Sequence, residues 1–231
     1  MIPVLVALCL RPDLIAGMLA SVDVPVSRRV VIDNGGAALI ADALHMPAGL
    51  GVAASWNLAL KLTIDAPWWV IASDDVTFPP GSLAQLVDAM ADPTPRIVCL
   101  ADDMAVFAMN AEALDTIGFF DENYHPAYCE DVDIEQRCRI TGVPIIALHA
   151  PLVHARSATI ADPWYREQND RTYPRNVEYH LAKWGGSAPR RGEDLASPFD
   201  RGGSVADWTL DPRRLRSLRW PRRDDGNGTV R

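Results

Sequence analysis

The apolar positions of this chain fall into short runs that alternate with stretches of helical periodicity. The short runs, rich in β-branched and aromatic residues, predict strands at residues 4–10, 29–33, 68–72, 96–100, 105–109 and 143–148. Apolar residues at helical spacing predict helices at residues 12–21, 52–64, 79–90, 111–117 and 130–140. This alternation predicts an α/β fold with a mostly parallel central sheet flanked by helices.

The pattern changes after about residue 160. Residues 164–184 are polar and aromatic and predict a surface helix, whereas the sequence beyond Gly185-Gly186 is rich in Gly, Pro, Arg and Asp. We expect an extended arm there, with isolated apolar anchors at Phe199, Trp208, Leu215, Leu218 and Trp220. The predicted division is a core over 1–160, a helical segment over 161–184 and a partly irregular basic arm over 185–231.

The charge of the chain argues against nucleic-acid binding. The 231 residues carry a net charge of −8, whereas a general nucleic-acid binder shows a basic face. Residues 1–183 hold 12 Lys and Arg against 23 Asp and Glu, and residues 184–231 hold 10 against 7. With nearly half of its residues apolar, the chain can bury the core of one domain of ordinary size.

Cysteine use and the first residues predict a cytoplasmic location. The four cysteines form no C-x-x-C pair, which is typical of reduced core thiols, at Cys9, Cys99, Cys129 and Cys138. The apolar residues 1–10 lack a preceding cation and are followed at once by Arg11-Pro12, so they predict a buried strand rather than a signal peptide. No apolar run reaches the about 20 residues of a membrane span.

Two acidic clusters stand where predicted elements begin or end. Asp74-Asp75 ends an apolar strand, and Glu130, Asp131, Asp133 and Glu135 open a predicted helix after an aromatic turn. Acids suit a helix N-terminus, but capping needs only one or two of them. Because ligands of parallel sheets bind beyond the carboxyl ends of the strands, the two clusters predict one acidic site for a metal and a hydroxyl nucleophile.

An ordered series of motifs over roughly residues 3–160 resembles the family-2 glycosyltransferases of the GT-A fold, of the short bacterial or phage type. The series is Leu10-Arg11-Pro12, Val31-Ile32-Asp33-Asn34-Gly35, Gly49-Leu50-Gly51 through Asn57, Ser73-Asp74-Asp75-Val76, Gly118-Phe119-Phe120-Asp121-Glu122, Glu130-Asp131-Val132-Asp133 and His154. No single motif is decisive, but their order and spacing are specific.

The resemblance implies an enzyme, a metal-dependent and inverting glycosyltransferase. It would move a sugar from a nucleotide-diphosphate donor to a hydroxyl of a glycan, lipid-linked or protein acceptor. Asp75 would bind Mn²⁺ or Mg²⁺, since carboxylates suit hard cations, and His154 would complete the metal shell, with His149 as its competitor. Ser73 stands where the family often has Asp, which leaves the ribose contact to Asp74 or to the Ser73 hydroxyl.

The resemblance also implies roles for further residues. Asp33 would contact the nucleobase, Leu10, Arg11 and Asn57 would frame the donor pocket, and Arg156 would offset diphosphate charge. An acceptor hydroxyl needs a base. The family's acidic motif assigns that role to Asp131, with Glu130 as the alternative.

Several of these residues have simpler interpretations. Asp74-Asp75 suits a helix cap, Asp33-Asn34 suits a turn, and Asp133 and Glu135 suit solvated charges paired with Arg137 and Arg139. Trp68 and Trp69 suit the core, and Trp164 and Tyr165 are weak candidates for a sugar platform.

Two other functions remain open at this point. A sugar nucleotidyltransferase would need a Gly-rich basic loop near the N-terminus, which residues 10–13 do not form, and a non-catalytic nucleotide-sugar or glycan-binding module is compatible with Ser73. The basic segment 211–220 is compatible with peripheral contact to anionic lipid, with docking on a second subunit or on an acidic protein acceptor, or with a solvated tail.

Overall fold

A computed structural model describes residues 3–34, 40–46, 49–155, 158–184 and 212–217 of the chain. Arg156 and most of the predicted basic arm lie outside the described residues, as do the arm anchors Phe199, Trp208, Leu218 and Trp220.

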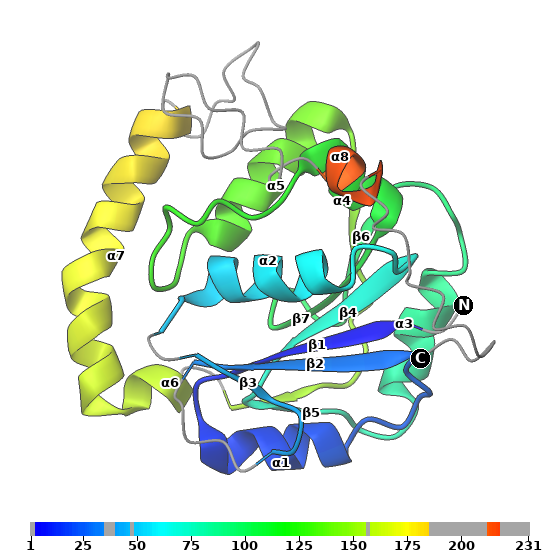
Figure 1. The fold of residues 1–231 in the computed structure, drawn as a ribbon, viewed down its shortest axis with the longest axis horizontal. Coiled ribbons are helices and arrows are strands. Elements are labelled where there is room, and N and C mark those ends of the chain that lie inside the picture. Colours follow the sequence, from blue (N-terminus) through cyan, green and yellow to red (C-terminus); the bar gives the residue numbers. More distant parts are fainter. Residues whose placement is uncertain (1–2, 35–39, 47–48, 156–157, 185–211, 218–231) are drawn as a thin grey trace, which may run out of the picture.

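A sheet of seven strands forms the centre of the fold, in the order β3-β2-β1-β4-β7-β6-β8 (Figure 1). The strands are β1 Val4–Cys9, β2 Arg28–Asp33, β3 Leu44–His45, β4 Trp68–Ser73, β6 Ile97–Cys99, β7 Val106–Asn110 and β8 Ile145–Ala147. Strand β1 pairs in parallel with β2 and β4, and β2 pairs in parallel with β3. Strand β7 runs antiparallel to both β4 and β6. The sheet is therefore mostly parallel, as predicted.

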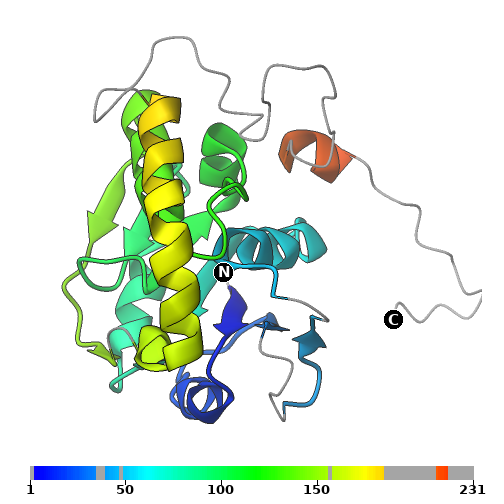
Figure 2. The same ribbon diagram turned by 90° about the vertical axis from the view of Figure 1, so that its left-hand side faces the viewer.

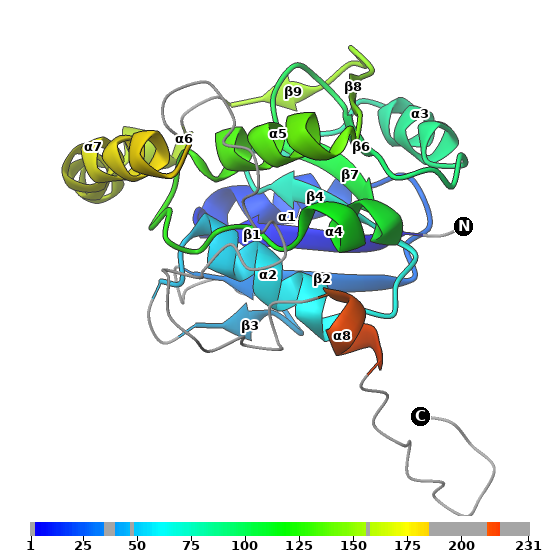
Figure 3. The same cartoon turned by 90° about the horizontal axis from the view of Figure 1, so that it is seen from above.

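Helices cover both faces of the sheet, because each strand sends alternate side chains to opposite sides. On β1, Val4, Val6 and Leu8 pack against one cluster, while Leu5 and Ala7 join the other. The first face carries α2 Val52–Leu62, α4 Ala111–Ile117 and α5 Glu130–Thr141, and the second carries α1 Pro12–Ala20 and α3 Ser82–Ala89. Figure 1 shows α2 and α5 above the sheet and α1 below it, and Figure 3 looks down on the first face.

A two-stranded ribbon lies beside the main sheet. Its strands, β5 Val76–Thr77 and β9 Val153–His154, pair antiparallel, with Val76 opposite His154. The backbone N–H of Ala155 also donates to the carbonyl of Asp75 at 2.9 Å. This ribbon, which the apolar pattern did not predict, fixes His154 next to Asp75.

A long helix, α7 Pro163–Trp184, follows the short α6 Ala158–Ala161 and stands at one end of the sheet (Figures 1 and 2). It confirms the predicted surface helix. Near its start, the Tyr165 hydroxyl donates to the carbonyl of Leu10 at 3.2 Å. Further along, Asn176 Nδ2 donates to the carbonyls of Ala127 and Tyr128 at 2.8 and 3.1 Å. The helix is thus tied to the end of β1 and to the loop before α5.

One piece of the predicted basic arm is described, the helix α8 Pro212–Ser217. Arg216 Nε donates to the carbonyl of Ile64 at 2.8 Å, and the same guanidinium pairs with Asp115 of α4. This cation therefore forms contacts within the chain. Among the helices described by the structure, none has the length and apolarity needed to cross a membrane.

Candidate active site

A cavity of about 610 Å³ opens where β1 and β4 end, between the start of α5 and one face of α7. Among the residues predicted for the site, those that line it are Leu10, Ser73, Asp74, Asp75, Glu130, Asp131 and His154. Two acidic segments that lie far apart in the sequence therefore meet in one cavity. This agrees with the expectation for the carboxyl ends of parallel strands.

Asp75 and His154 form a carboxylate–imidazole pair in this cavity. His154 Nε2 lies 3.4 Å from Asp75 Oδ1, and His154 Nδ1 lies 3.5 Å from Asp103 Oδ2. Burial raises the pKa of Asp75, and the nearby His154 opposes that shift. His154 Nδ1 is buried without a well-formed hydrogen bond to any described residue.

The donor atoms of this pair fit a divalent cation. An oxygen and an imidazole nitrogen suit Mn²⁺, and the oxygen suits Mg²⁺. No cluster of three or more His, Cys, Asp or Glu side chains within the described ranges is arranged to hold a metal by itself. Further ligands would have to come from a bound substrate or from water.

Asp74 holds the loop between β1 and α1 through hydrogen bonds. Its Oδ2 accepts the backbone N–H groups of Leu10 and Arg11, both at 2.6 Å. Burial raises the pKa of Asp74 to about 6, although these two hydrogen bonds oppose the shift. Asp74 lines the cavity and also holds this loop through its hydrogen bonds. Its contact with a ribose stays a prediction.

Arg11 belongs to the same loop and does not line the cavity. It donates from Nη1 to the carbonyl of Ala158 at 2.7 Å and pairs through Nη2 with Asp13 at 2.7 Å. Arg11 therefore ties the start of α1 to α6. Its predicted contact with the donor stays a prediction.

Asp33 lies beside the cavity rather than in its lining. Its buried carboxylate is 2.7 Å from Nδ1 of His45, on the neighbouring β3. The next residue, Asn34, does line the cavity, and it accepts the N–H of Leu50 at 3.0 Å while donating to Ser55 Oγ at 2.7 Å. A contact between Asp33 and a nucleobase stays a prediction.

Asn57 also lies away from the lining. Its Nδ2 donates to the Phe120 carbonyl at 2.8 Å, and its Oδ1 accepts the Phe120 N–H at 2.9 Å. The amide nitrogen and oxygen of Asn57 thus both hold the backbone of Phe120 against α2. We leave Asn57 out of the proposed donor site for this reason.

The first turn of α5 presents two acids to the cavity in different environments. Glu130 is buried, its Oε2 lacks a hydrogen-bond partner among the described residues, and burial, reinforced by Asp131, raises its pKa to about 8. Asp131 is more exposed, and its Oδ1 accepts the N–H of Val132 at 2.8 Å. Glu130 is therefore mostly protonated near neutral pH.

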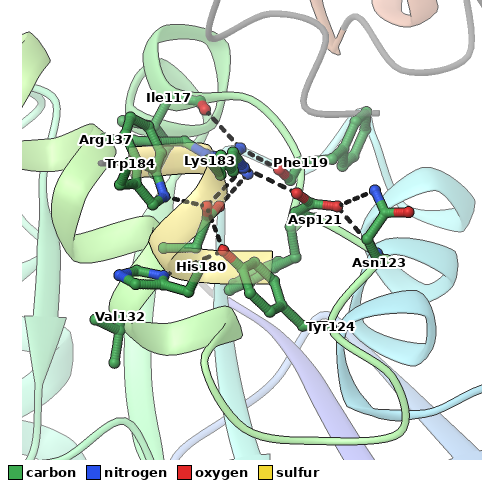
Figure 4. A network of polar contacts seen from close by, with 12 residues as sticks. Ile117, Phe119, Asp121, Asn123, Tyr124, Val132, Arg137, His180, Lys183 and Trp184 are labelled. Atoms are coloured by element: carbon green, nitrogen blue, oxygen red, sulfur yellow. Dashed lines mark hydrogen bonds and ion pairs between the residues drawn. The ribbon is translucent and has the colours of Figure 1, made fainter. Parts of the chain in front are cut away.

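Asp133 pairs with Arg137 as predicted, but the pair is buried, so the prediction of solvated charges was wrong for Asp133. Figure 4 shows Arg137, Lys183 and Trp184 of the network around it. Its Oδ1 accepts hydrogen bonds from Lys183 at 2.6 Å and from Trp184 Nε1 at 2.8 Å, and its Oδ2 pairs with Arg137. Lys183 also reaches Asp121 Oδ2 at 2.8 Å. The network joins the end of α7 to the start of α5.

Several residues of the cavity were not predicted. Tyr128 comes from the loop before α5, and Gln168, Asn169 and Thr172 come from α7. None belongs to an acidic or Gly-rich motif. Only the polar and aromatic character of α7 pointed toward them, and it singled out Trp164 and Tyr165, of which Tyr165 does line the cavity.

The layered sheet with this site at its strand ends is the GT-A fold of glycosyltransferases. Solved structures of glycosyltransferases share it, among them the following two. A mannosyltransferase of Pyrobaculum calidifontis, in complex with GDP-Man and Mn²⁺, matches with a TM-score of 0.59 and 17% identity over 94% of this chain and 70% of that one. Glucosyl-3-phosphoglycerate synthase of Mycobacterium tuberculosis, in complex with Mn²⁺, UDP and glucosyl-3-phosphoglycerate, matches with a TM-score of 0.55 and 14% identity over 83% and 82%.

The sequence itself has a shorter match. A galactofuranosyl glycosyltransferase of Leishmania donovani is 54% identical over 41 residues, which is 18% of this chain and 9% of that protein. No family model matches the chain. The structural likenesses establish the fold.

Proposed function

We propose that this chain is a glycosyltransferase that moves a sugar from a nucleotide-diphosphate donor to an acceptor hydroxyl, with inversion. The observation that carries the proposal is the convergence of the Asp75–His154 pair with Glu130 and Asp131 in one cavity at the strand ends. The GT-A fold and the glycosyltransferase activity in the names of the similar proteins support it. A cytoplasmic location remains part of the proposal.

Asp75 and His154 would hold a Mn²⁺ or Mg²⁺ ion, the metals named for the similar synthase. The described lining includes the carboxylates of Asp74, Asp75, Asp103 and Asp131 but no Lys or Arg, so it would repel a diphosphate that came without a cation. A bound divalent cation supplies Lewis-acid stabilisation of the charge on the departing nucleoside diphosphate.

In our proposal, Asp131 is the general base. The acceptor oxygen attacks the anomeric carbon, the new C–O bond forms as the bond to the diphosphate oxygen breaks, and the hydroxyl proton passes to the Asp131 carboxylate. Attack from the face opposite the leaving group inverts that carbon. Glu130 is less suited to this role near neutral pH, since its raised pKa of about 8 keeps it mostly protonated.

The first experiment is a titration of the purified chain with UDP, GDP and dTDP in Mn²⁺ and then in EDTA. Nucleotide release from the matching sugars is measured next. We expect one nucleotide to bind only with the metal, and its sugar conjugates to be consumed.

The variant Asp131→Asn should bind the donor normally but lose turnover, while Glu130→Gln should keep most of it. Loss of turnover in Glu130→Gln alone would transfer the role of base to Glu130. Donor binding without any turnover would favour a binding module, and no binding of any nucleotide would overturn the proposal.

A further inference from the structure

Two tyrosines meet at the edge of the cavity, next to the candidate base. The rings of Tyr128 and Tyr173 lie 5.8 Å apart at an interplanar angle of 81°, and the two residues are 38% and 46% exposed. Tyr128 lines the cavity, and Tyr173 extends the aromatic surface onto α7. Both residues are therefore partly accessible to a further partner.

The backbone at Tyr128 is held in an unfavourable conformation. Tyr128 has φ of +74° and Cys129 has φ of +77°, in the left-handed region that side chains other than glycine rarely adopt. Such a conformation is energetically unfavourable for a side chain other than glycine. Asn176 of α7 holds this segment through its hydrogen bonds to the carbonyls of Ala127 and Tyr128. The fold therefore keeps the Tyr128 ring at the cavity despite this cost.

The wall beside these rings carries neutral polar side chains. Tyr165, Gln168, Asn169 and Thr172 are spaced at helical intervals, so they share one face of α7, and all four line the cavity. Amide and hydroxyl groups can both donate and accept hydrogen bonds. This combination of aromatic faces and uncharged hydrogen-bonding groups matches the hydroxyls and the C–H face of a sugar ring.

The negative charge of the cavity favours a neutral acceptor over an anionic one. Asp131 and Glu130 stand at the start of α5, close along the chain to Tyr128, and no Lys or Arg belongs to the described lining. In a partly buried site, the Asp131 carboxylate would repel a phosphate or carboxylate on the acceptor.

We propose that the α7 wall and the Tyr128–Tyr173 pair form the acceptor subsite, and that the acceptor is an uncharged sugar or glycan. This inference rests on the proposed glycosyl transfer and assigns its acceptor. Tyr173 is a specificity-determining residue in this scheme, since its ring packs on the acceptor away from the reacting atoms.

The test uses the full chain with its matching donor and Mn²⁺. Consumption of the donor is followed with water alone, with a panel of neutral methyl glycosides, and with sugar phosphates and 3-phosphoglycerate. We expect at least one neutral glycoside to accelerate consumption and the anionic compounds to have no effect. Acceleration by the anionic compounds, or by none of the neutral glycosides, would overturn the inference.

Variants of Tyr173 sharpen the test. Tyr173→Ala should raise the acceptor KM about 3- to 10-fold while kcat and the donor KM stay unchanged, and Tyr173→Phe should restore the KM because it keeps the ring. Leu181→Ala is the matched control, because Leu181 is similarly exposed on α7 and lies eight residues, about two helical turns, beyond Tyr173. An unchanged acceptor KM in Tyr173→Ala would contradict the subsite. Failure of the donor to bind or hydrolyse would instead count against the proposed function.

Discussion

The ammonium group of Lys183 lies 2.6 Å from Oδ1 of Asp133, which joins the last turn of α7 to the first turn of α5. Burial opposes the ionisation of Asp133, yet the charges of Arg137 and Lys183, with hydrogen bonds from Lys183 and Trp184, lower its pKa. Asp133 therefore remains a carboxylate inside the protein. The position of the helix that carries Glu130 and Asp131 depends on this pairing.

Replacing Lys183 with Met should destabilise the protein by about 3–5 kcal/mol, because two buried carboxylates lose their shared cation. Denaturant unfolding measures this change. Arg171→Met on the same helix is the control, since its pair with Glu167 is exposed and should contribute no more than about 0.5 kcal/mol. Equal losses in the two variants would contradict the structural role of the buried network.

Glu130 should make the protein less stable as the pH rises. Its pKa is about 8 in the folded chain against an ordinary value of 4.5, so between these values the folded state holds a proton that the unfolded state has released. Stability should fall across that interval by a few kcal/mol, on the order set by about 1.4 kcal/mol per unit.

The variant Glu130→Gln should lose this contribution. Melting temperatures of both proteins from pH 5 to 9 provide the comparison, because other groups titrate in both alike. Parallel curves for the two proteins would show that Glu130 ionises at its ordinary value.

The candidate metal pair makes a prediction for Asp75→Asn. We expect nucleotide affinity in Mn²⁺ to fall at least about 10- to 100-fold and to become insensitive to EDTA, because a carboxylate ligand is lost. Asp102→Asn is a matched control, since Asp102 forms a similar pair with His149 at 3.0 Å but both residues are exposed. If Asp102→Asn abolished metal-dependent binding and Asp75→Asn did not, the metal would be assigned to Asp102 and His149 instead.

Gly51, at the start of α2, should tolerate no side chain. It has φ of +81°, and a Cβ there would lie 2.7 Å from the carbonyl oxygen of Pro126, which already accepts the N–H of Val52 at 2.7 Å. Gly51→Ala should destabilise the protein by more than about 1 kcal/mol and displace the loop before α5.

Gly17→Ala in α1 is the opposite case. A Cβ there meets no atom within 4 Å, and alanine favours a helix interior, so this variant should gain about 0.5–1 kcal/mol. Thermal unfolding of the two variants should shift in opposite directions. A similar shift for both would contradict the close approach at Gly51.

Local patterns were sufficient to predict most elements of the fold. The apolar runs at β1, β2 and β4 and the helical spacing of α2 each reflect burial that is visible within one element. The reversal of β7 was not predicted, because the direction of a strand depends on which neighbour it pairs with. The β5–β9 ribbon was missed for a similar reason, since its two-residue strands are too short to show any period.

The acidic motifs predicted which segments meet at the cavity, but not how each acid is paired. The surface interpretation of Asp133 failed because its partner Lys183 lies 50 residues further along the chain. Tyr128 and Tyr173 were not singled out because an isolated tyrosine has no characteristic spacing. Such long-range partners become visible only once the chain has folded.

The late position of Lys183 has a consequence for biosynthesis. Asp133 leaves the ribosome 50 residues ahead of its countercharge, which at ordinary translation rates is an interval of roughly 3–10 seconds. The strands and helices that precede α7 can assemble during that time. The contacts of Asp133 with Lys183 and Trp184 can form only when the end of α7 has emerged, so a nascent or C-terminally clipped chain would contain the sheet while α5 lacks these contacts.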